Sequence, residues 1–318
     1  NPAQQQAVTA ANGPTLVLAG PGSGKTRVLT RRIAYLIGHL GVRPYSIMAV
    51  TFTNKAARQM GERVDALLEG QTRGLQLGTF HAMCARILRR EAAAFPFDSN
   101  FVIFDSDDQL GIVKQAVKDL DLNDKQYRPR MLHGVISKAK NELITPAEFS
   151  INSYRDEVAQ RVYTRYQEAL QANNALDFDD LLLYAALLLE DVPEMRQKYA
   201  RQFEHVLVDE FQDTNMAQYR LLKHLASRHR NLFVVGDTDQ SIYRWRGADY
   251  RNVLRFEEDY PDAVTILLEQ NYRSTQTILD AAMRVIEQNP LRTHKELTTE
   301  RGAGARITIH EAFNGTEE

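Results

Sequence analysis

A glycine-rich turn between an apolar run and a helical pattern is the part of the sequence with the clearest chemistry. The run Leu16–Leu18 precedes Ala19, Gly20, Pro21, Gly22, Ser23, Gly24, Lys25 and Thr26. Glycines in such a turn let backbone N–H groups converge on an anion, and the following helix directs its positive end at the same point. The spacing is typical of a phosphate-binding loop, in which Lys25 reaches the β- and γ-phosphates and the Thr26 hydroxyl binds Mg²⁺.

One residue of this loop departs from the strict pattern. Ala19 stands where the pattern has its first glycine, and alanine is tolerable there only if its φ stays negative. A chance glycine-rich loop is the alternative interpretation. The apolar run before the loop and the helical pattern after it favour a true nucleotide site, so ATP and Mg²⁺ are the expected ligands.

Two adjacent carboxylates supply a second half for this site. Asp209 and Glu210 follow the apolar run Val206–Val208 and therefore stand at the end of a predicted strand. Asp209 is expected to bind Mg²⁺ and Glu210 to orient and deprotonate the attacking water. Many strands end in acidic residues, but together with Lys25 and Thr26 the pair predicts an ATP-hydrolysing site.

A polar loop follows the next predicted strand. Gln240 lies in it, at the ligand-binding edge of a parallel sheet, where its amide could hydrogen-bond a γ-phosphate and so report that phosphate. The residues that come next interleave aromatic rings with arginines: Tyr243, Arg244, Trp245 and Arg246. That pattern suits stacking on unpaired bases beside a charged backbone. Burial in the core is the alternative for Trp245, and its arginine neighbours argue against it.

Two further strand ends carry similar residues. Thr51, Phe52 and Asn54 lie where a strand meets a helix, which is a ready site for a nucleic-acid phosphate backbone. Thr53 as a simple helix N-cap is a compatible second interpretation. Later, Tyr272 could stack on adenine and Arg273 could reach a γ-phosphate, although spacing alone leaves both roles open.

The predicted elements explain how these residues could meet. Strands and helices alternate up to about residue 82 and again from 204 to 270, which predicts an α/β fold whose parallel sheet is covered on both faces. Residues 83–203 read as an all-helical insertion. Residues 271–318 read as one helix, one loop and one strand at 305–310, the truncated start of a further domain.

Composition limits the function classes. The net charge of −2 means that any nucleic-acid surface is local, and 43% apolar residues suffice for a sizeable core. The single cysteine, Cys84, excludes an intrachain disulfide and is expected in the core. No apolar run has the ~18 residues of a membrane span and no signal peptide is visible, so a cytoplasmic protein without membrane partners is expected.

Clusters of charged residues have two interpretations. The acidic groups near residues 105–108 and 177–180 could bind a metal, but carboxylates that complement helix N-termini explain them better. Basic residues between 128 and 140 suit either a solvated helix face or contacts to nucleic-acid phosphates, and that choice stays open.

Taken together, these motifs resemble the UvrD/PcrA/Rep group of superfamily 1 DNA helicases, in order and over nearly the whole chain. The matching stretches are residues 1–4, 19–26, 49–57, 78–81, 208–214, 235–247 and 268–274. The resemblance implies a RecA-like core with a helical insertion and a second RecA-like core. It also implies a 3′-to-5′ translocase on single-stranded DNA and at single-strand/double-strand junctions, with possible repair-protein partners.

The resemblance also implies residue roles. Gln4 would read adenine between Arg27 and Tyr272, while Gln240 and Arg273 would contact the γ-phosphate. The single-strand path would be lined by Phe52, His81, Phe178, Tyr243, Trp245 and Arg246. Ala19 agrees with the family's own form of the phosphate-binding loop.

The family's second core supplies an arginine across the nucleotide, and only about the first 45 residues of that core are expected here. Such an arginine is worth roughly 10³–10⁵ in rate, so the chain alone is expected to bind ATP weakly and hydrolyse it poorly. Two alternatives stay open. One is the helicase portion of a RecB- or AddA-like helicase–nuclease, and the other is a non-enzymatic single-strand binding module.

Overall fold

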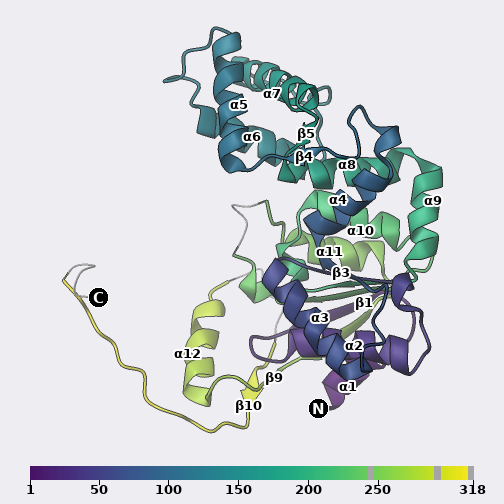
Figure 1. Ribbon diagram of the computed structural model, residues 1–318. Helices are drawn as coiled ribbons and strands as arrows, with labels where there is room; N and C mark the ends of the chain where they lie inside the picture. The colour runs from purple at the N-terminus through teal and green to yellow at the C-terminus, as the bar shows by residue number, and fades with distance from the viewer. Residues whose placement is uncertain (243–246, 290–294, 314–318) are drawn as a thin grey trace.

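A parallel sheet forms the centre of the molecule (Figure 1). The computed structural model describes residues 1–242, 247–289 and 295–313. Among these, six strands pair in the spatial order β3–β2–β6–β7–β1–β8, and every pair is parallel. Their bounds are β1 (Thr15–Ala19), β2 (Ile47–Thr51), β3 (Gln76–Thr79), β6 (His205–Val208), β7 (Leu232–Gly236) and β8 (Val264–Leu268).

Alternate residues of each strand enter two separate cores, which is why the central strands read as unbroken apolar runs. Leu16 and Leu18 of β1 face one core, whereas Val17 and Ala19 face the other. The second core is covered by α1 (Pro2–Val8), α2 (Lys25–Gly38) and α3 (Asn54–Leu68). The first is covered by α4 (Phe80–Arg90), α8 (Phe178–Asp191), α9 (Pro193–Gln202), α10 (Met216–Leu225) and α11 (Arg251–Asp259). The expected α/β class with a covered parallel sheet is confirmed.

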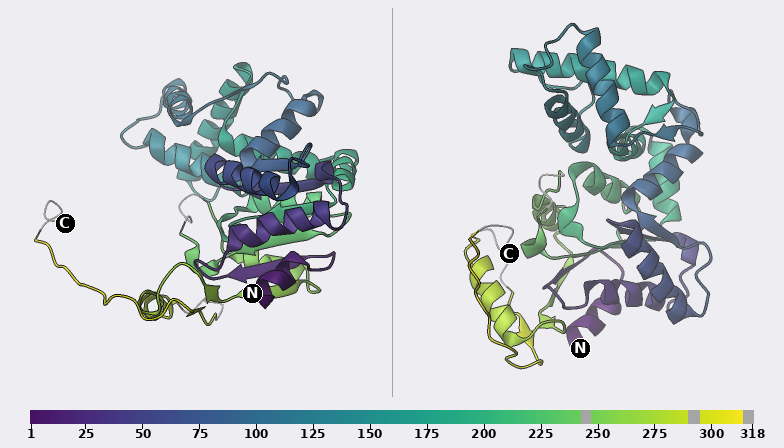
Figure 2. Two further views of the ribbon diagram at one scale, coloured as in Figure 1. Left: turned by 60° about the horizontal axis from the view of Figure 1, so that its bottom comes forward. Right: turned by 60° about the vertical axis from the view of Figure 1, so that its left-hand side comes forward.

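The chain between β3 and β6 is mainly helical. Three of its helices enclose a third core of their own: α5 (Ser106–Asp119), α6 (Pro129–Asn141) and α7 (Tyr154–Ala172). They stand together at one end of the molecule, while α4 and α8 reach back to the sheet (Figure 2). A small parallel pair, β4 (Val102–Ile103) with β5 (Ala175–Leu176), corrects the expectation of a purely helical insertion. Two-residue strands are too short to show a period of two in sequence.

The C-terminal part is less compact. It comprises β9 (Gln270–Asn271), α12 (Gln276–Ile286) and β10 (Thr298–Thr299), and β10 pairs with β9. The strand predicted at 305–310 is wrong, because these residues are exposed and form no strand. In the left view of Figure 2 the C-terminal segment runs away from the sheet. Ile307 and Ile309 are 55% and 92% exposed, so they pack against no layer. Short 3₁₀ turns complete the described elements: η1 (Pro44–Ser46), η2 (Ala92–Ala94), η3 (Phe211–Asp213) and η4 (Thr238–Gln240).

The acidic clusters act at helix ends, as expected. Asp105 caps α5 and Asp177 caps α8, each in a capping box with the carboxylate three residues later. No group of three or more potential metal ligands occurs among the described residues. Cys84 is fully buried in the sheet core, and burial raises the pKa of its thiol to about 12. Over the described part of the chain, every helix is too short or too polar to cross a bilayer.

Candidate nucleotide and nucleic-acid site

The glycine-rich turn joins β1 to α2 in the geometry that its sequence predicts. Gly22 and Gly24 adopt φ values of +68° and +90°, which side chains rarely tolerate. Ala19 remains in the strand and outside this left-handed region, so alanine is compatible with its position. Lys25 is the first residue of α2, so the open N–H groups of that helix point into the turn.

The carboxylates at the end of β6 lie against this turn. Lys25 Nζ is 3.2 Å from Glu210 Oε2. Thr26 Oγ1 donates a hydrogen bond of 3.3 Å to Asp209 Oδ2. Glu210 has a φ of +49°, which turns the chain sharply after the strand. The structure therefore brings together the four residues to which the sequence assigns phosphate, magnesium and water.

Negative charge accumulates at this strand end. Burial, followed by the charge of Glu210, raises the pKa of Asp209 to about 6, and the same two causes raise that of Asp213 to about 6. The positive charge of Lys25 lowers both pKa values, but this one ammonium faces the three carboxylates of Asp209, Glu210 and Asp213. A divalent cation would relieve this excess.

The site also contains unsatisfied polar atoms. Asp213 Oδ1 is buried and has no hydrogen-bond partner among the described residues, and the buried Lys25 Nζ has only its ion pair with Glu210. Unpaired buried groups are costly and usually mark a missing ligand or water. The residues of this site are therefore suited to binding a nucleoside triphosphate together with Mg²⁺.

The loop is held from two sides by residues far away in sequence. Gln4 Nε2 donates to the Ser23 carbonyl oxygen at 2.7 Å. Asn271 Nδ2 donates to the Pro21 carbonyl oxygen at 2.5 Å, and the Tyr272 backbone N–H donates to Gly22 at 3.0 Å. The loop thus lies between the N-terminal helix and the segment after β8.

The candidate adenine and γ-phosphate residues are placed as follows. Arg273 lies beside Gly22, because a Cβ built on that glycine would come 2.7 Å from the Cβ of Arg273. Tyr272 is 41% exposed, and its hydroxyl donates to Gln270 Oε1. Arg27 is exposed on the first turn of α2. Tyr272, Arg273 and Gln4 thus flank the loop from segments that sequence spacing alone could not place together.

Gly22→Ala is expected to weaken ATP binding about tenfold. A side chain costs roughly 1–2 kcal/mol in the left-handed region, and this Cβ would also collide with Asn271 and Arg273. Titration with a fluorescent ATP analogue measures the change. Gly61→Ala is the matched control, because Gly61 lies in α3 with nothing near its Cβ position. Equal affinity of both variants for ATP would contradict the geometry of the loop.

A chain of hydrogen bonds connects Gln240 to Glu210. Its Nε2 donates to Asp237 Oδ2 at 2.5 Å. The Asp237 backbone N–H donates to Gln212 Oε1, and Gln212 Nε2 donates to Glu210 Oε2 at 2.9 Å. Gln212 therefore links the ends of β6 and β7. Its only signal in sequence is its place in the stretch after Asp209 and Glu210.

A second residue that sequence reasoning missed is Lys295. Its fully buried ammonium forms ion pairs with Asp237 and with Asp239, the latter at 3.1 Å. Leu297, two residues on, lies directly over Gly20. The polar stretch around Lys295 has no periodicity that could have indicated either contact. The C-terminal segment is thus fastened to the nucleotide edge of the sheet.

Candidate nucleic-acid residues gather where the insertion meets the sheet. The ring of Phe52 packs on Phe80 at 5.7 Å between centroids, and that of His81 meets Phe178 at 5.8 Å. Phe178 is 46% exposed. Burial lowers the pKa of His81, which favours the neutral ring. This cluster comes from the turn after β2, from α4 and from α8.

The other members of the set are less uniform. Asn54 is exposed at the start of α3, whereas Thr51 is only 1% exposed and its hydroxyl donates to the Thr53 carbonyl oxygen. Thr51 thus supports the turn from inside and its side chain does not reach the surface. Thr53 caps α3 through the Ala56 N–H. Tyr243, Trp245 and Arg246 lie outside the described residues.

Lys25 and Thr26 lie in a strand–loop–helix, and Asp209 and Glu210 face them at one edge of a parallel sheet. This arrangement defines the fold of a P-loop nucleoside triphosphatase of the RecA-like class. Family models identify the branch. The UvrD/REP helicase N-terminal domain matches residues 1–261, and the UvrD-like helicase C-terminal domain matches residues 266–318. The chain belongs to the UvrD/Rep helicase family, as the motif resemblance predicted.

Curated relatives agree with this assignment. The chain is 52% identical over 316 residues to an ATP-dependent DNA helicase PcrA of Bacillus subtilis, covering 99% of this chain and 43% of the relative. Proteins of the same name from Staphylococcus aureus (strain Mu50) and Staphylococcus epidermidis are 50% and 49% identical over 320 residues, covering 100% of this chain and 44% of each relative. The chain thus spans less than half the length of these relatives.

Proposed function

We propose that this chain is the N-terminal motor part of an ATP-dependent DNA helicase. The protein would move along single-stranded DNA, 3′ to 5′ as the family resemblance implies, and open single-strand/double-strand junctions in repair or replication. The observation that carries the proposal is the pairing of Lys25 with Glu210 and of Thr26 with Asp209. Relatives named as DNA helicases support it. We place it in the cytoplasm, with its DNA substrate.

The nucleotide site would work by exchange of partners. Thr26 and Asp209 would hold Mg²⁺, which when bound neutralises charge on the phosphates. Lys25 now pairs with Glu210, and a triphosphate in the turn would compete for its ammonium. Glu210, released from that pair, would accept the proton of the attacking water.

The flanking residues would read the rest of the nucleotide. Gln4 and Tyr272, with Arg27, would hold adenine, because both contact the loop or its immediate neighbours. Arg273 beside Gly22 would reach the γ-phosphate. To contact the γ-phosphate, Gln240 would have to break its hydrogen bond to Asp237, and this exchange makes Gln240 a candidate sensor of ATP.

The DNA path would cross the aromatic cluster at the junction of insertion and sheet. Phe52, His81 and Phe178 offer stacking surfaces there, and Asn54 offers a polar contact to the backbone. Tyr243, Trp245 and Arg246 are proposed as further members from their sequence alone. The proposed division is a RecA-like core (1–82 and 204–270), an insertion (83–203) and the start of a second RecA-like core (271–318).

The proposal is tested by ATP hydrolysis with and without single-stranded DNA, on this chain and on the full-length protein. We expect DNA-stimulated turnover in the full-length protein and turnover lower by roughly 10³–10⁵ in this chain, because the second core supplies the arginine finger. Comparable DNA-stimulated turnover in both would refute the division of labour. Absence of DNA stimulation in the full-length protein would refute the motor itself.

A further inference from the structure

Asn141 stands at the junction between the helical insertion and the sheet. It is the last residue of α6 and only 8% exposed. Its Nδ2 donates to Asp179 Oδ1 at 3.1 Å, and its Oδ1 accepts a hydrogen bond from Asn215 Nδ2. One amide side chain therefore joins α8 of the insertion to the start of α10 beside the sheet.

The Asn215 end of this bridge is rigidly tied to the nucleotide site. Asn215 caps α10 and lies five residues after Glu210, with η3 between them. Asn252 Nδ2 donates to the carbonyl oxygens of Thr214 (2.9 Å) and Asn215 (3.2 Å). Gln212, within the same short segment, donates to Glu210. A displacement of Glu210 would therefore also displace Asn215.

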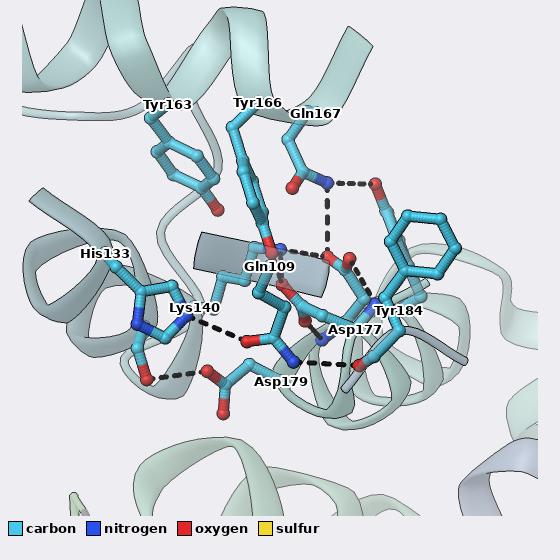
Figure 3. Close-up of polar contacts among 12 residues, drawn as sticks. Gln109, His133, Lys140, Tyr163, Tyr166, Gln167, Asp177, Asp179 and Tyr184 are labelled. Carbon is cyan, nitrogen blue, oxygen red and sulfur yellow. Dashed lines mark hydrogen bonds and ion pairs between the residues drawn. The ribbon is translucent and has the colours of Figure 1, made fainter. Parts of the chain in front are cut away.

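The Asp179 end is tied to the proposed DNA face. Asp179, which is labelled in Figure 3, directly follows Phe178. Its Oδ2 accepts a hydrogen bond from Ser137 Oγ at 2.6 Å. The residues on either side of Phe178 and Asp179 are held by Lys140, whose Nζ lies 2.6 Å from Asp177 Oδ2 and 2.7 Å from Asp180 Oδ1. The backbone that carries the Phe178 ring is thus anchored at each neighbouring residue, so its position follows that of α6.

We propose that Asn141 is a positioning residue that couples the nucleotide site to the DNA-facing Phe178. The inference rests on the proposed function. It holds that binding of DNA at Phe178 is transmitted to the nucleotide site through a series of hydrogen-bonded residues: Asp179, Asn141, Asn215 and the segment from Gln212 to Glu210. Asn141 is not one of the residues that we propose to bind nucleotide or DNA. Its loss should therefore change the response of hydrolysis to DNA and leave hydrolysis without DNA intact.

The test exchanges donor and acceptor within the bridge of the full-length protein. In Asn141→Asp the new carboxylate still accepts from Asn215 but faces Asp179, so the bridge to α8 is repelled. Combining it with Asp179→Asn restores a donor–acceptor pair with the roles reversed. We expect N141D to lower the stimulation of ATP hydrolysis by single-stranded DNA about tenfold, within the 5–150-fold usual for coupled sites, and the double variant to recover it. Hydrolysis without DNA and the melting temperature should stay near wild type.

Asn173→Asp is the matched control, because Asn173 is exposed at the end of α7 and bonds only within its own helix in the contacts described. If N141D does not stay folded at the assay temperature, Asn141→Ser removes the bridge without adding charge and should show the same loss. Wild-type DNA stimulation in N141D, or no recovery in the double variant, would overturn the inference. Absence of stimulation in the wild-type protein would instead overturn the proposed function.

Discussion

We expect Lys25→Ala to lower ATP hydrolysis by the full-length protein about 100-fold or more and to leave its affinity for single-stranded DNA nearly unchanged. The buried ammonium lies 3.2 Å from Glu210 Oε2, and among the described residues it is the one cation in an ion pair with the two carboxylates that follow β6. Removing a preorganised charge from a transferred phosphate typically costs 10²–10³ in rate. The turnover number at saturating DNA and the dissociation constant for an oligonucleotide measure the two effects.

Lys114→Ala serves as the control, since Lys114 is exposed on α5, far along the chain from the glycine-rich turn. It should leave turnover and DNA affinity as they are. An active Lys25→Ala enzyme would show that the turn is structural only. A variant that loses DNA binding together with turnover would show that the aromatic cluster depends on the turn for its shape.

We expect Lys140→Met to destabilise the protein by about 3–5 kcal/mol. Lys140 is fully buried among Asp177, Asp180 and the rings of Tyr163 and Tyr166 (Figure 3). Burial alone would raise the pKa of Asp177, but Lys140 outweighs it and the pKa lies below its usual range. Without the ammonium, two buried carboxylates face each other uncompensated. Denaturant titration monitored by circular dichroism measures the loss.

The pH dependence of this loss has a defined sign. In the wild type, the lowered pKa of Asp177 contributes stability that is present above its unfolded value and disappears as pH falls. In Lys140→Met the carboxylates gain protons more readily in the folded state, so the difference between variant and wild type should shrink from pH 7 to pH 5. Lys138→Met is the control, because Lys138 is exposed on the same helix, 3.9 Å from Glu142, and should change stability by less than about 0.5 kcal/mol. Equal effects of the two substitutions would contradict the assigned role of Lys140.

The sequence predicts the sheet well because its strands are buried on both faces. The runs at 47–50, 206–208 and 232–235 are apolar without a break, and each lies in a central strand. The glycine-rich turn is equally legible, since Gly22 and Gly24 occupy conformations that other residues avoid. The strand expected at 305–310 fails for the opposite reason, because an alternating pattern forms a strand only where a partner edge exists.

The contacts between distant segments were beyond sequence reasoning. Gln212, Lys295 and Asn141 are polar residues without periodicity, and each acts through one or two side-chain contacts to an element elsewhere in the chain. A polar side chain at such a junction looks in sequence like any solvated residue. Its role appears only when the fold has brought its partners within hydrogen-bonding distance.

Calorimetric titration of ATP into this chain, with Mg²⁺ or with EDTA, tests the central claim most directly, namely that a magnesium-bound triphosphate lies between the Lys25 turn and the carboxylates that follow β6. We predict that Mg²⁺ tightens ATP binding about tenfold or more in the wild type, and that Asp209→Asn abolishes this gain while ATP still binds without the metal. The same gain from Mg²⁺ in Asp209→Asn as in the wild type would contradict it.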